Sequence, residues 1–471
     1  MEWYTITFIL CLFGAFKEFR PSESFIIKYY KGHWKNFTDT QLNQEIFPVT
    51  TYFWLVCLVL AFLLVDMVRY KPAIILCGLC GAVTYVIVLF GTTILQIQLA
   101  QIIFAIMLST EVAYYTYIYT KVDKIRYEMV TGFTRCAFLF GRFMAGVVAQ
   151  LTTSYNLLDY EQLHYLTIGA CTLASISACF LPSVSQSIYF NQRSKPPFAS
   201  ISTIYLGDSS KDISDNKSPS VNSVASIPAP LTFGAKLRNA YYLLWSDFLK
   251  AYTNRHVVKW SLWWAFATCG YIQVVHYIQL LWNHVKDLEK LPGDYESSEE
   301  TEKNDIYNGA IEATYTIMSA VMVVVIGHLR LNWSLLGEPI LAIFSLIGGL
   351  LLGVLCISHN IWIMYGAYIA FGVIYHSIIT IANFEVAKHL SQDSYGLIFG
   401  INTFLALLIQ TILTLVVITW LQVSITTQFI IYGCYFITLG LIFVVMSIFT
   451  LVKVVRSQKP IIFCIKSSGA N

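Results

Sequence analysis

Charged side chains are scarce in this chain of 471 residues: 30 basic and 27 acidic residues make up only 12% of it. Soluble domains usually carry roughly 25%. Hydrophobic residues account for 56% of the chain and the mean hydropathy is +0.62. A protein this apolar exposes an apolar surface that needs lipid around it, which excludes a soluble globular protein. A net charge of only +3 gives no indication of nucleic acid as a partner. We therefore expect an all-α membrane protein.

Cysteine is present eleven times but without the pattern of a zinc site or a disulfide framework. Cys77 and Cys80 have CxxC spacing, yet no second pair and no flanking histidine accompanies them. Ten of the eleven lie inside apolar runs, where cysteine packs as a small hydrophobic side chain. We predict no metal site and no cofactor. A cleavable signal peptide is not expected either, because the first apolar run passes directly into charged residues.

Apolar runs long enough to span a bilayer recur along the chain and predict twelve transmembrane helices. A segment rich in Ser, Pro, Asn and Asp interrupts them and predicts a flexible cytoplasmic linker over residues 185–255. The end of the linker (KLRNAYYLLWSDFLKAY) has the pattern of a helix lying on the membrane surface. The linker separates a six-helix half (1–184) from a second six-helix half (256–453), and a cytoplasmic tail (454–471) follows. Two such halves resemble the major facilitator architecture, which has its substrate site between the halves. The runs begin at Trp3, Val49, Ala73, Ile94, Val130, Leu163, Trp260, Ile306, Ile340, Ile361, Tyr395 and Phe429.

Loop charges predict the orientation of these spans. Basic residues follow the second, fourth and twelfth runs, so those ends and both termini are expected in the cytoplasm. The segment from Asp287 to Asp305 has eight acidic residues and two lysines and joins the seventh and eighth runs, which places it outside. Asn36 begins an Asn-Phe-Thr glycosylation acceptor in the first external loop.

The few charges inside the predicted spans are candidate site residues, because a charge at the bilayer centre costs about 3 kcal/mol or more unless it lines a cavity or is paired. Glu111 shares a helix face with Tyr114 and Tyr115. A carboxylate flanked by phenol rings suits an organic cation, since the charge and the ring quadrupoles both attract it. The alternative is an ion pair of Glu111 with Arg135 or Arg142, with the tyrosines as packing.

Three further polar side chains lie within predicted spans. Glu312, early in the eighth run, either meets a cation in the outer half of the membrane or is a salt-bridged or proton-carrying structural acid. His276 and His376 each have the chemistry to carry a coupling proton, and the alternative for each is a neutral, hydrogen-bonded core histidine.

Seven segments together resemble the reduced folate carrier and thiamine transporter family (solute carrier family nineteen) in order and spacing. The resemblance covers Cys11 to about Val452 without the linker. It implies a plasma-membrane carrier for a water-soluble vitamin that works by alternating access, and it implies a cytoplasmic gate at DMVRYKP, residues Asp66 to Pro72, which includes Arg69. The segments are CLFGAFKEFRPSESF, NQEIFPV, VDMVRYKPAIIL, TEVAYYTYIY, IYNGAIEA, NWSLLGE and FGINTFLALLIQT.

The charged positions favour the thiamine branch of that family. Folates are dianions that need cationic partners, whereas thiamine carries a fixed positive thiazolium. The positions matching Glu111, Gln410 and Gly372 are arginine, lysine and arginine in the folate carriers. The residues that match the thiamine branch, by the same resemblance, are Glu23, Phe47, Tyr114 and Glu312.

Three positions depart from the thiamine pattern. Thr50 replaces a tryptophan, and His276 stands where the thiamine branch has an asparagine. Arg142 is unexpected there and lies two turns from Arg135 on nearly the same face, where it either neutralises Glu111 or attracts an anion.

The first hypothesis is a carrier of thiamine or a related cation, with Glu111 and Tyr114 as hydrogen-bond partners of the aminopyrimidine. Glu23 and Glu312 would keep the vestibule negative, Phe47 and Tyr115 would supply aromatic faces, and a carboxylate or His276 would couple a proton. A counter-anion is the other coupling ion considered, and a monomer surrounded by lipid is expected. The residues assigned to gating or coupling are Asp66, Arg69, Arg135 and Gln410.

Two other hypotheses stay open. A folate-like carrier would use Arg135 and Arg142 in place of the missing cations, and a non-transporting sensor would bind the vitamin and signal through the linker. An enzyme is not expected, because no nucleophile and base or metal cluster lies on facing spans.

Overall fold

The computed structural model describes residues 2–122, 126–184, 233–289, 307–328, 333–389 and 395–456. All regular secondary structure within these ranges is helical. Nine of the helices found there are long and apolar enough to cross a membrane. The all-α membrane fold expected from the composition is confirmed.

The first group of helices comprises α1 to α7. Pro21 ends the first apolar run, because proline lacks the backbone N–H and cannot continue the α-helix. Thr93 and Gln96 form a capping box that begins α5. The elements are α1 (Trp3–Glu18), a 3₁₀ turn (Pro21–Phe25), α2 (Ile26–Lys31), a π-helical turn (Gln41–Ile46), α3 (Phe47–Val65), α4 (Lys71–Phe90), α5 (Ile94–Lys121), α6 (Tyr127–Ser154) and α7 (Gln162–Cys179).

The second group comprises α9 to α15 and follows helix α8. Asn360 caps α13 by accepting a hydrogen bond from the Trp362 backbone N–H. The elements are α8 (Phe233–Thr253), α9 (Arg255–Glu289), α11 (Asn308–His328), α12 (Trp333–Ile357), α13 (Ile361–Lys388), α14 (Tyr395–Thr414) with a π-helical turn (Leu415–Trp420), and α15 (Ile425–Arg456).

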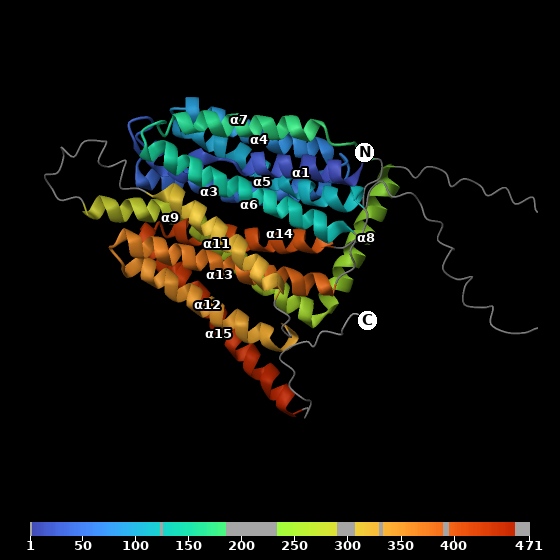
Figure 1. Ribbon diagram of the computed structural model, residues 1–471. Coiled ribbons are helices and arrows are strands. Elements are labelled where there is room, and N and C mark those ends of the chain that lie inside the picture. The colour runs from blue at the N-terminus through green and yellow to red at the C-terminus, as the bar shows by residue number, and fades with distance from the viewer. Residues whose placement is uncertain are drawn as a thin grey trace, which may run out of the picture.

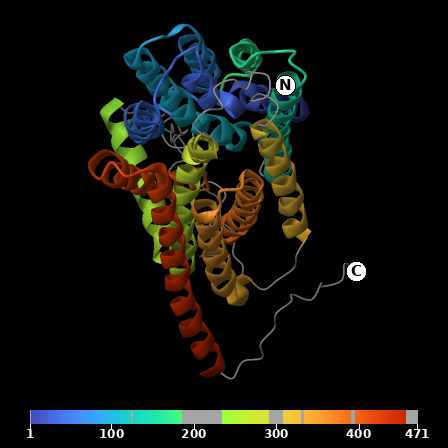
Figure 2. The same ribbon diagram turned by 90° about the vertical axis from the view of Figure 1, so that its left-hand side faces the viewer.

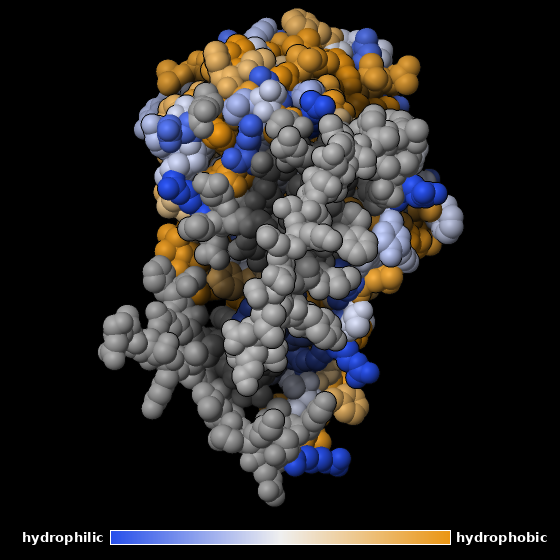
Figure 3. All heavy atoms as spheres, turned by 90° about the vertical axis from the view of Figure 1, so that its right-hand side faces the viewer, coloured by the Kyte–Doolittle hydropathy of each residue, from blue (hydrophilic) through white to orange (hydrophobic). Residues whose placement is uncertain are grey.

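The two groups lie side by side, with the first above the second in Figure 1 and in the view along the bundle in Figure 2. The start of α1, helix α8 and the end of α15 lie toward one end of the bundle, which we name the terminal end, and the opposite end is named the distal end (Figure 1). Figure 3 looks onto the terminal end, where hydrophilic side chains lie on the end face and hydrophobic ones cover the flank of the first group.

Helix α8 forms where the sequence predicts a surface helix, and it crosses the terminal end (Figure 1). Its Tyr242 and Trp245 are 73% and 61% exposed. The helix is held to the second group by Tyr252, whose hydroxyl donates a hydrogen bond of 2.7 Å to Asn402 Oδ1. The position of α8 on a membrane stays a prediction. Residues 185–232 of the predicted linker, residues 290–305 of the predicted external loop and residues 457–471 of the predicted tail lie outside the described ranges.

Two close approaches join the helix groups. Helix α6 packs against α11, and α3 packs against α14. A Cβ atom at Gly146 would lie 2.6 Å from the Gly309 carbonyl oxygen, so only glycine allows this backbone contact. At the second contact, a side chain on Gly400 would overlap the ring of Phe62. Small residues thus set the separation of the groups, as in other membrane helix pairs.

Candidate functional site

A cavity of about 290 Å³ lies between the two groups of helices. The first group contributes α1 with its 3₁₀ turn and parts of α2 to α6, and the second contributes α9 and α11. The structure brings together five of the residues selected from the sequence in its lining: Glu23, Phe47, Arg142, His276 and Glu312.

The ionisable side chains of the lining, apart from tyrosine and histidine, are three carboxylates and two guanidinium groups. Glu23 accepts hydrogen bonds from Arg20 Nη1 at 2.7 Å and from the Tyr85 hydroxyl at 2.5 Å. Its side chain is nevertheless 37% exposed, whereas that of Glu18 is 2% exposed. Glu18 is also paired with Lys17, so the accessible Glu23 carboxylate is the feature that favours a positively charged guest.

An ion pair crosses the cavity between the helix groups. Arg142 Nη2 of α6 lies 3.6 Å from Glu312 Oε2 of α11. Glu312 also accepts a hydrogen bond of 2.9 Å from the Tyr368 hydroxyl. The alternative in which Arg142 neutralises Glu111 is wrong, because its carboxylate partner is Glu312, on a helix that the sequence alone does not place beside it.

Glu111 and its two tyrosines lie outside the residues that line this cavity. Lys17 Nζ lies 2.7 Å from Glu111 Oε2 and 2.8 Å from Glu18 Oε1, so one ammonium serves two carboxylates. The Tyr115 hydroxyl donates to Glu111 Oε1 at 3.2 Å, and the Tyr114 hydroxyl donates to the Leu10 carbonyl oxygen at 3.0 Å. Glu111 is therefore ion-paired, as the alternative proposed, but with a lysine of α1 instead of an arginine of α6.

Arg135 and Gln410 are likewise absent from the cavity lining. The Arg135 guanidinium lies 5.3 Å from the ring centroid of Phe138, a cation–π contact within its own helix. Gln410 in α14 is fully buried, and its amide makes no hydrogen bond within the described ranges. A role of either residue in gating or coupling stays a prediction.

The expected gate segment forms the turn between α3 and α4 at the terminal end. The Tyr70 hydroxyl donates a hydrogen bond to Asp66, and Lys71 Nζ donates one of 2.8 Å to the carbonyl oxygen of Cys179, where α7 ends. Arg69 and Tyr70 both have φ of 63°, a left-handed conformation that costs energy in residues other than glycine. The turn is thus strained and is anchored to α7.

Sequence reasoning missed several residues of the cavity. Arg20 is a charged residue at the end of the first apolar run, but nothing in its spacing links it to a site. Tyr271 of α9 carries no such signal, since aromatic residues are common in cores. Its hydroxyl forms hydrogen bonds with the hydroxyl of Tyr315 and, at 3.2 Å, with His376 Nε2. Trp54 also lines the cavity, and its ring centroid lies 6.4 Å from that of His276.

Polar contacts join the two groups on the distal side of the cavity. Lys31 Nζ of α2 lies 2.6 Å from Asp287 of α9 and 2.9 Å from Asp39. Partial burial alone would lower the pKa of Lys31, but hydrogen bonds to these two carboxylates outweigh it and raise the pKa above its usual value. Gln279 Nε2 donates a hydrogen bond of 2.8 Å to the backbone oxygen of Glu23. In the same distal region, Asn36 lies exposed between α2 and the π-helical turn, and its glycosylation stays a prediction.

Solved structures share this arrangement of helices. The nucleoside transporter NupG superposes with a TM-score of 0.58 at 14% sequence identity, over 94% of this chain and 98% of that protein. A POT family transporter in complex with 5-aminolevulinic acid gives a TM-score of 0.60 at 14% identity, over 95% and 96%. At this identity the likeness concerns the fold alone. Together with the nine apolar helices in the described ranges, it shows a multi-pass membrane protein with the same fold as these transporters.

The chain belongs to the reduced folate carrier family, whose model matches residues 1–431. Thiamine transporter 2 of Macaca fascicularis is 37% identical over 98% of this chain and 93% of its own length. Thiamine transporter 1 of Homo sapiens is 35% identical over 96% and 91%, and folate transporter 1 of Caenorhabditis elegans is 34% identical over 94% and 92%. The resemblance identified from the sequence motifs is confirmed, and the protein is a transporter rather than an enzyme.

Proposed function

We propose that this protein carries thiamine or a closely related organic cation across the plasma membrane by alternating access. The observation that carries the proposal is the charge of the cavity, in which three carboxylates face two guanidinium groups. Because Glu18 is also paired with Lys17, the accessible carboxylate is that of Glu23, and a dianion would have to bind beside it. The relatives named thiamine transporters 1 and 2, at 35% and 37% identity, support the same choice.

In this proposal different residues of the lining supply the charge and the aromatic rings that bind a cation. Glu23 is the principal counter-charge, because its side chain is the most exposed of the acids that form ion pairs there. Phe47 and Trp54 present aromatic rings that favour a positively charged ring by cation–π attraction. For Glu111 and Tyr114 to act as ligands, the ion pair of Glu111 with Lys17 would have to open in another state of the carrier.

A carrier that works by alternating access has one end in the cytoplasm and one end outside the cell. In this proposal α1, α7 and α9 also span the membrane, which completes two six-helix halves, and the terminal end faces the cytoplasm. The distal end, with Asn36, then faces outward. Opening toward the outside would separate Lys31 from Asp287 and Gln279 from the Glu23 backbone. Proton coupling would use His276 or the hydrogen-bonded His376, and the carrier would work as a monomer in the lipid.

Uptake of labelled thiamine and labelled folate, measured side by side in cells that lack both carriers, tests the proposal. Cells that express this protein are expected to take up thiamine with saturable kinetics, while folate uptake stays at the level of cells with empty vector. Saturable folate uptake with thiamine at background would overturn the proposal.

A folate-like carrier is the second candidate, and one observation favours it. Arg20 and Arg142 both line the cavity, and the Arg142 side chain is 29% exposed. Folate transporter 1 of Caenorhabditis elegans, at 34% identity, is a relative of this kind. The uptake experiment above separates the two candidates. A non-transporting sensor would bind the vitamin without accumulating it in sealed vesicles.

A further inference from the structure

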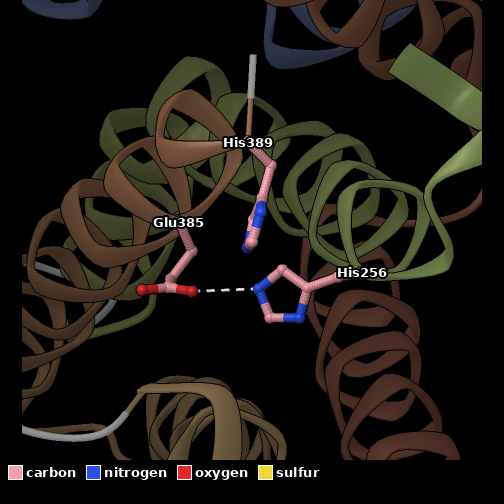
Figure 4. A group of neighbouring side chains, drawn as sticks. All are labelled: His256, Glu385 and His389. Carbon is pink, nitrogen blue, oxygen red and sulfur yellow. Dashed lines mark hydrogen bonds and ion pairs between the residues drawn. The ribbon is translucent and has the colours of Figure 1, made fainter. Parts of the chain in front are cut away.

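We propose that His256, Glu385 and His389 form a binding site for a divalent transition-metal ion of the zinc type at the terminal end of the second helix group. The three side chains converge from two helices, and their ligand atoms all lie within 4.8 Å of one another (Figure 4). None of the three lines the cavity between the groups.

The two helices hold the ligands at their ends. His256 is the second residue of α9, and its backbone N–H donates a hydrogen bond of 2.9 Å to Asn254 Oδ1, which fixes the start of the helix. Glu385 lies in the last turn of α13, and His389 follows directly after that helix. Because Glu385 and His389 are four residues apart on consecutive turns, both face the same side, where α9 begins.

The spacing of the three ligand atoms is close to the spacing around a bound zinc ion. His256 Nε2 lies 2.9 Å from Glu385 Oε2, and the ring centroids of His256 and His389 are 4.8 Å apart. Tetrahedral zinc with ligands at about 2.0 to 2.1 Å separates its ligand atoms by roughly 3.3 Å. The His389 ring therefore has to approach by about 1.5 Å at most, which a side-chain rotation of this exposed residue allows.

Burial explains why the site is suited to a cation. Glu385 is 1% exposed, and a buried carboxylate requires a positive partner. Lys388 Nζ lies 3.8 Å from the other oxygen, Oε1, which leaves Oε2 facing the histidines. His256 is partly and His389 largely open to solvent, so an ion can enter from the terminal end and keep a water molecule as its fourth ligand.

The donor set selects the kind of ion. Two imidazole nitrogens and one carboxylate oxygen suit zinc and its neighbours, whereas magnesium and calcium prefer oxygen ligands throughout. A bound ion would tie the start of α9, next to α8, to the end of α13. Since α9 also carries Tyr271 and His276 of the cavity, occupancy would restrain a helix that has to move in transport.

Zinc binding to the purified full-length protein, stripped with a chelator, tests this inference. Competition with a chromophoric chelator is expected to give one zinc ion per chain, and zinc is expected to raise the temperature of thermal unfolding. Magnesium at the same concentration is expected to do neither. His389→Ala should weaken zinc binding at least tenfold, and His359→Ala, which changes an exposed histidine between α12 and α13, should leave it unchanged.

Replacement by another ligand separates metal binding from a structural role. His389→Cys supplies a thiolate and is expected to restore zinc binding, whereas a merely structural histidine would not be rescued by cysteine. His389 is exposed, so its variants are expected to fold. Zinc affinity and thermal stabilisation that are the same in His389→Ala as in the unaltered protein would overturn the proposal, as would equal losses in His359→Ala.

Discussion

Arg142 and Glu312 form an ion pair of 3.6 Å that joins α6 to α11 across the cavity. Both side chains are partly exposed, at 29% and 14%, so each can exchange its partner for a charged guest. The pair therefore links the charge of the site to the separation of the two helix groups. A cation that approaches Glu312 competes with Arg142, and an anion that approaches Arg142 competes with Glu312.

Neutralising either member of this pair should affect a cationic substrate in opposite directions. Glu312→Gln leaves two carboxylates and two guanidinium groups in the lining, and loss of a charged partner worth about 1.5 kcal/mol raises the KM for thiamine about tenfold. Arg142→Gln makes the cavity more negative and should keep or lower the KM. Uptake kinetics at equal surface expression provide the measurement, and equal losses in both variants would indicate that only the intact pair matters.

Lys17 is expected to contribute more to stability than Glu111, because it neutralises two carboxylates. Lys17→Gln leaves Glu111 without its ammonium partner and should destabilise the protein by about 3 to 5 kcal/mol, as breaking a buried ion pair does. Glu111→Gln should cost less, since Lys17 keeps Glu18. Thermal unfolding of the purified variants measures both. A Glu111→Gln variant of unchanged stability that no longer takes up thiamine would instead assign Glu111 to the substrate site.

The contact between Lys31 and Asp287 is expected to hold the distal side closed. Asp287→Asn removes a partly exposed ion pair worth up to about 1 kcal/mol, so an impermeant thiol reagent added to intact cells should label Val275→Cys in the cavity about two to five times faster. Asp39→Asn is the matched control, because Asp39 contacts the same lysine from within the first helix group. Equal rates in Asp287→Asn and Asp39→Asn would contradict a closing role.

The close approach of Gly146 and Gly309 predicts a strong effect of a single methyl group. A Cβ atom at Gly309 would lie 2.7 Å from the Gly146 carbonyl oxygen, so Gly309→Ala forces α6 and α11 apart and should destabilise the protein by about 1 to 3 kcal/mol. A Cβ atom at Gly132, on helix α6, meets no atom within 4 Å, so Gly132→Ala should be neutral. Thermal unfolding and thiamine uptake of the two variants check this, and a fully active, stable Gly309→Ala would contradict it.

The helices were largely predictable, because a helix that crosses lipid needs a long run of apolar residues. The apolar runs predicted the starts of the first long helices to within a few residues, and the sequence motifs predicted the family. The pattern at the end of the linker also predicted α8 as a helix. These features depend on neighbours along the chain, where periodicity and composition carry the information.

The partners of charged side chains were less predictable, because they come from distant segments. Glu111 is 94 positions from Lys17 in the sequence, and nothing in the spacing ranks that lysine above Arg135 or Arg142. The same limit applies to metal ligands. Cysteine spacing carries no information about the proposed ligands, because His256 and Glu385 are 129 positions apart and meet only after α9 and α13 pack together.

The most direct test of the proposed cation site is the KM for labelled thiamine of Glu23→Gln compared with Glu45→Gln at equal surface expression. Glu23 is the accessible carboxylate of the cavity, whereas Glu45 is an exposed acid outside its lining. The account predicts a KM at least tenfold higher for Glu23→Gln and an unchanged value for Glu45→Gln. Thiamine uptake by Glu23→Gln with an unchanged KM, or loss of uptake in both variants alike, would contradict it.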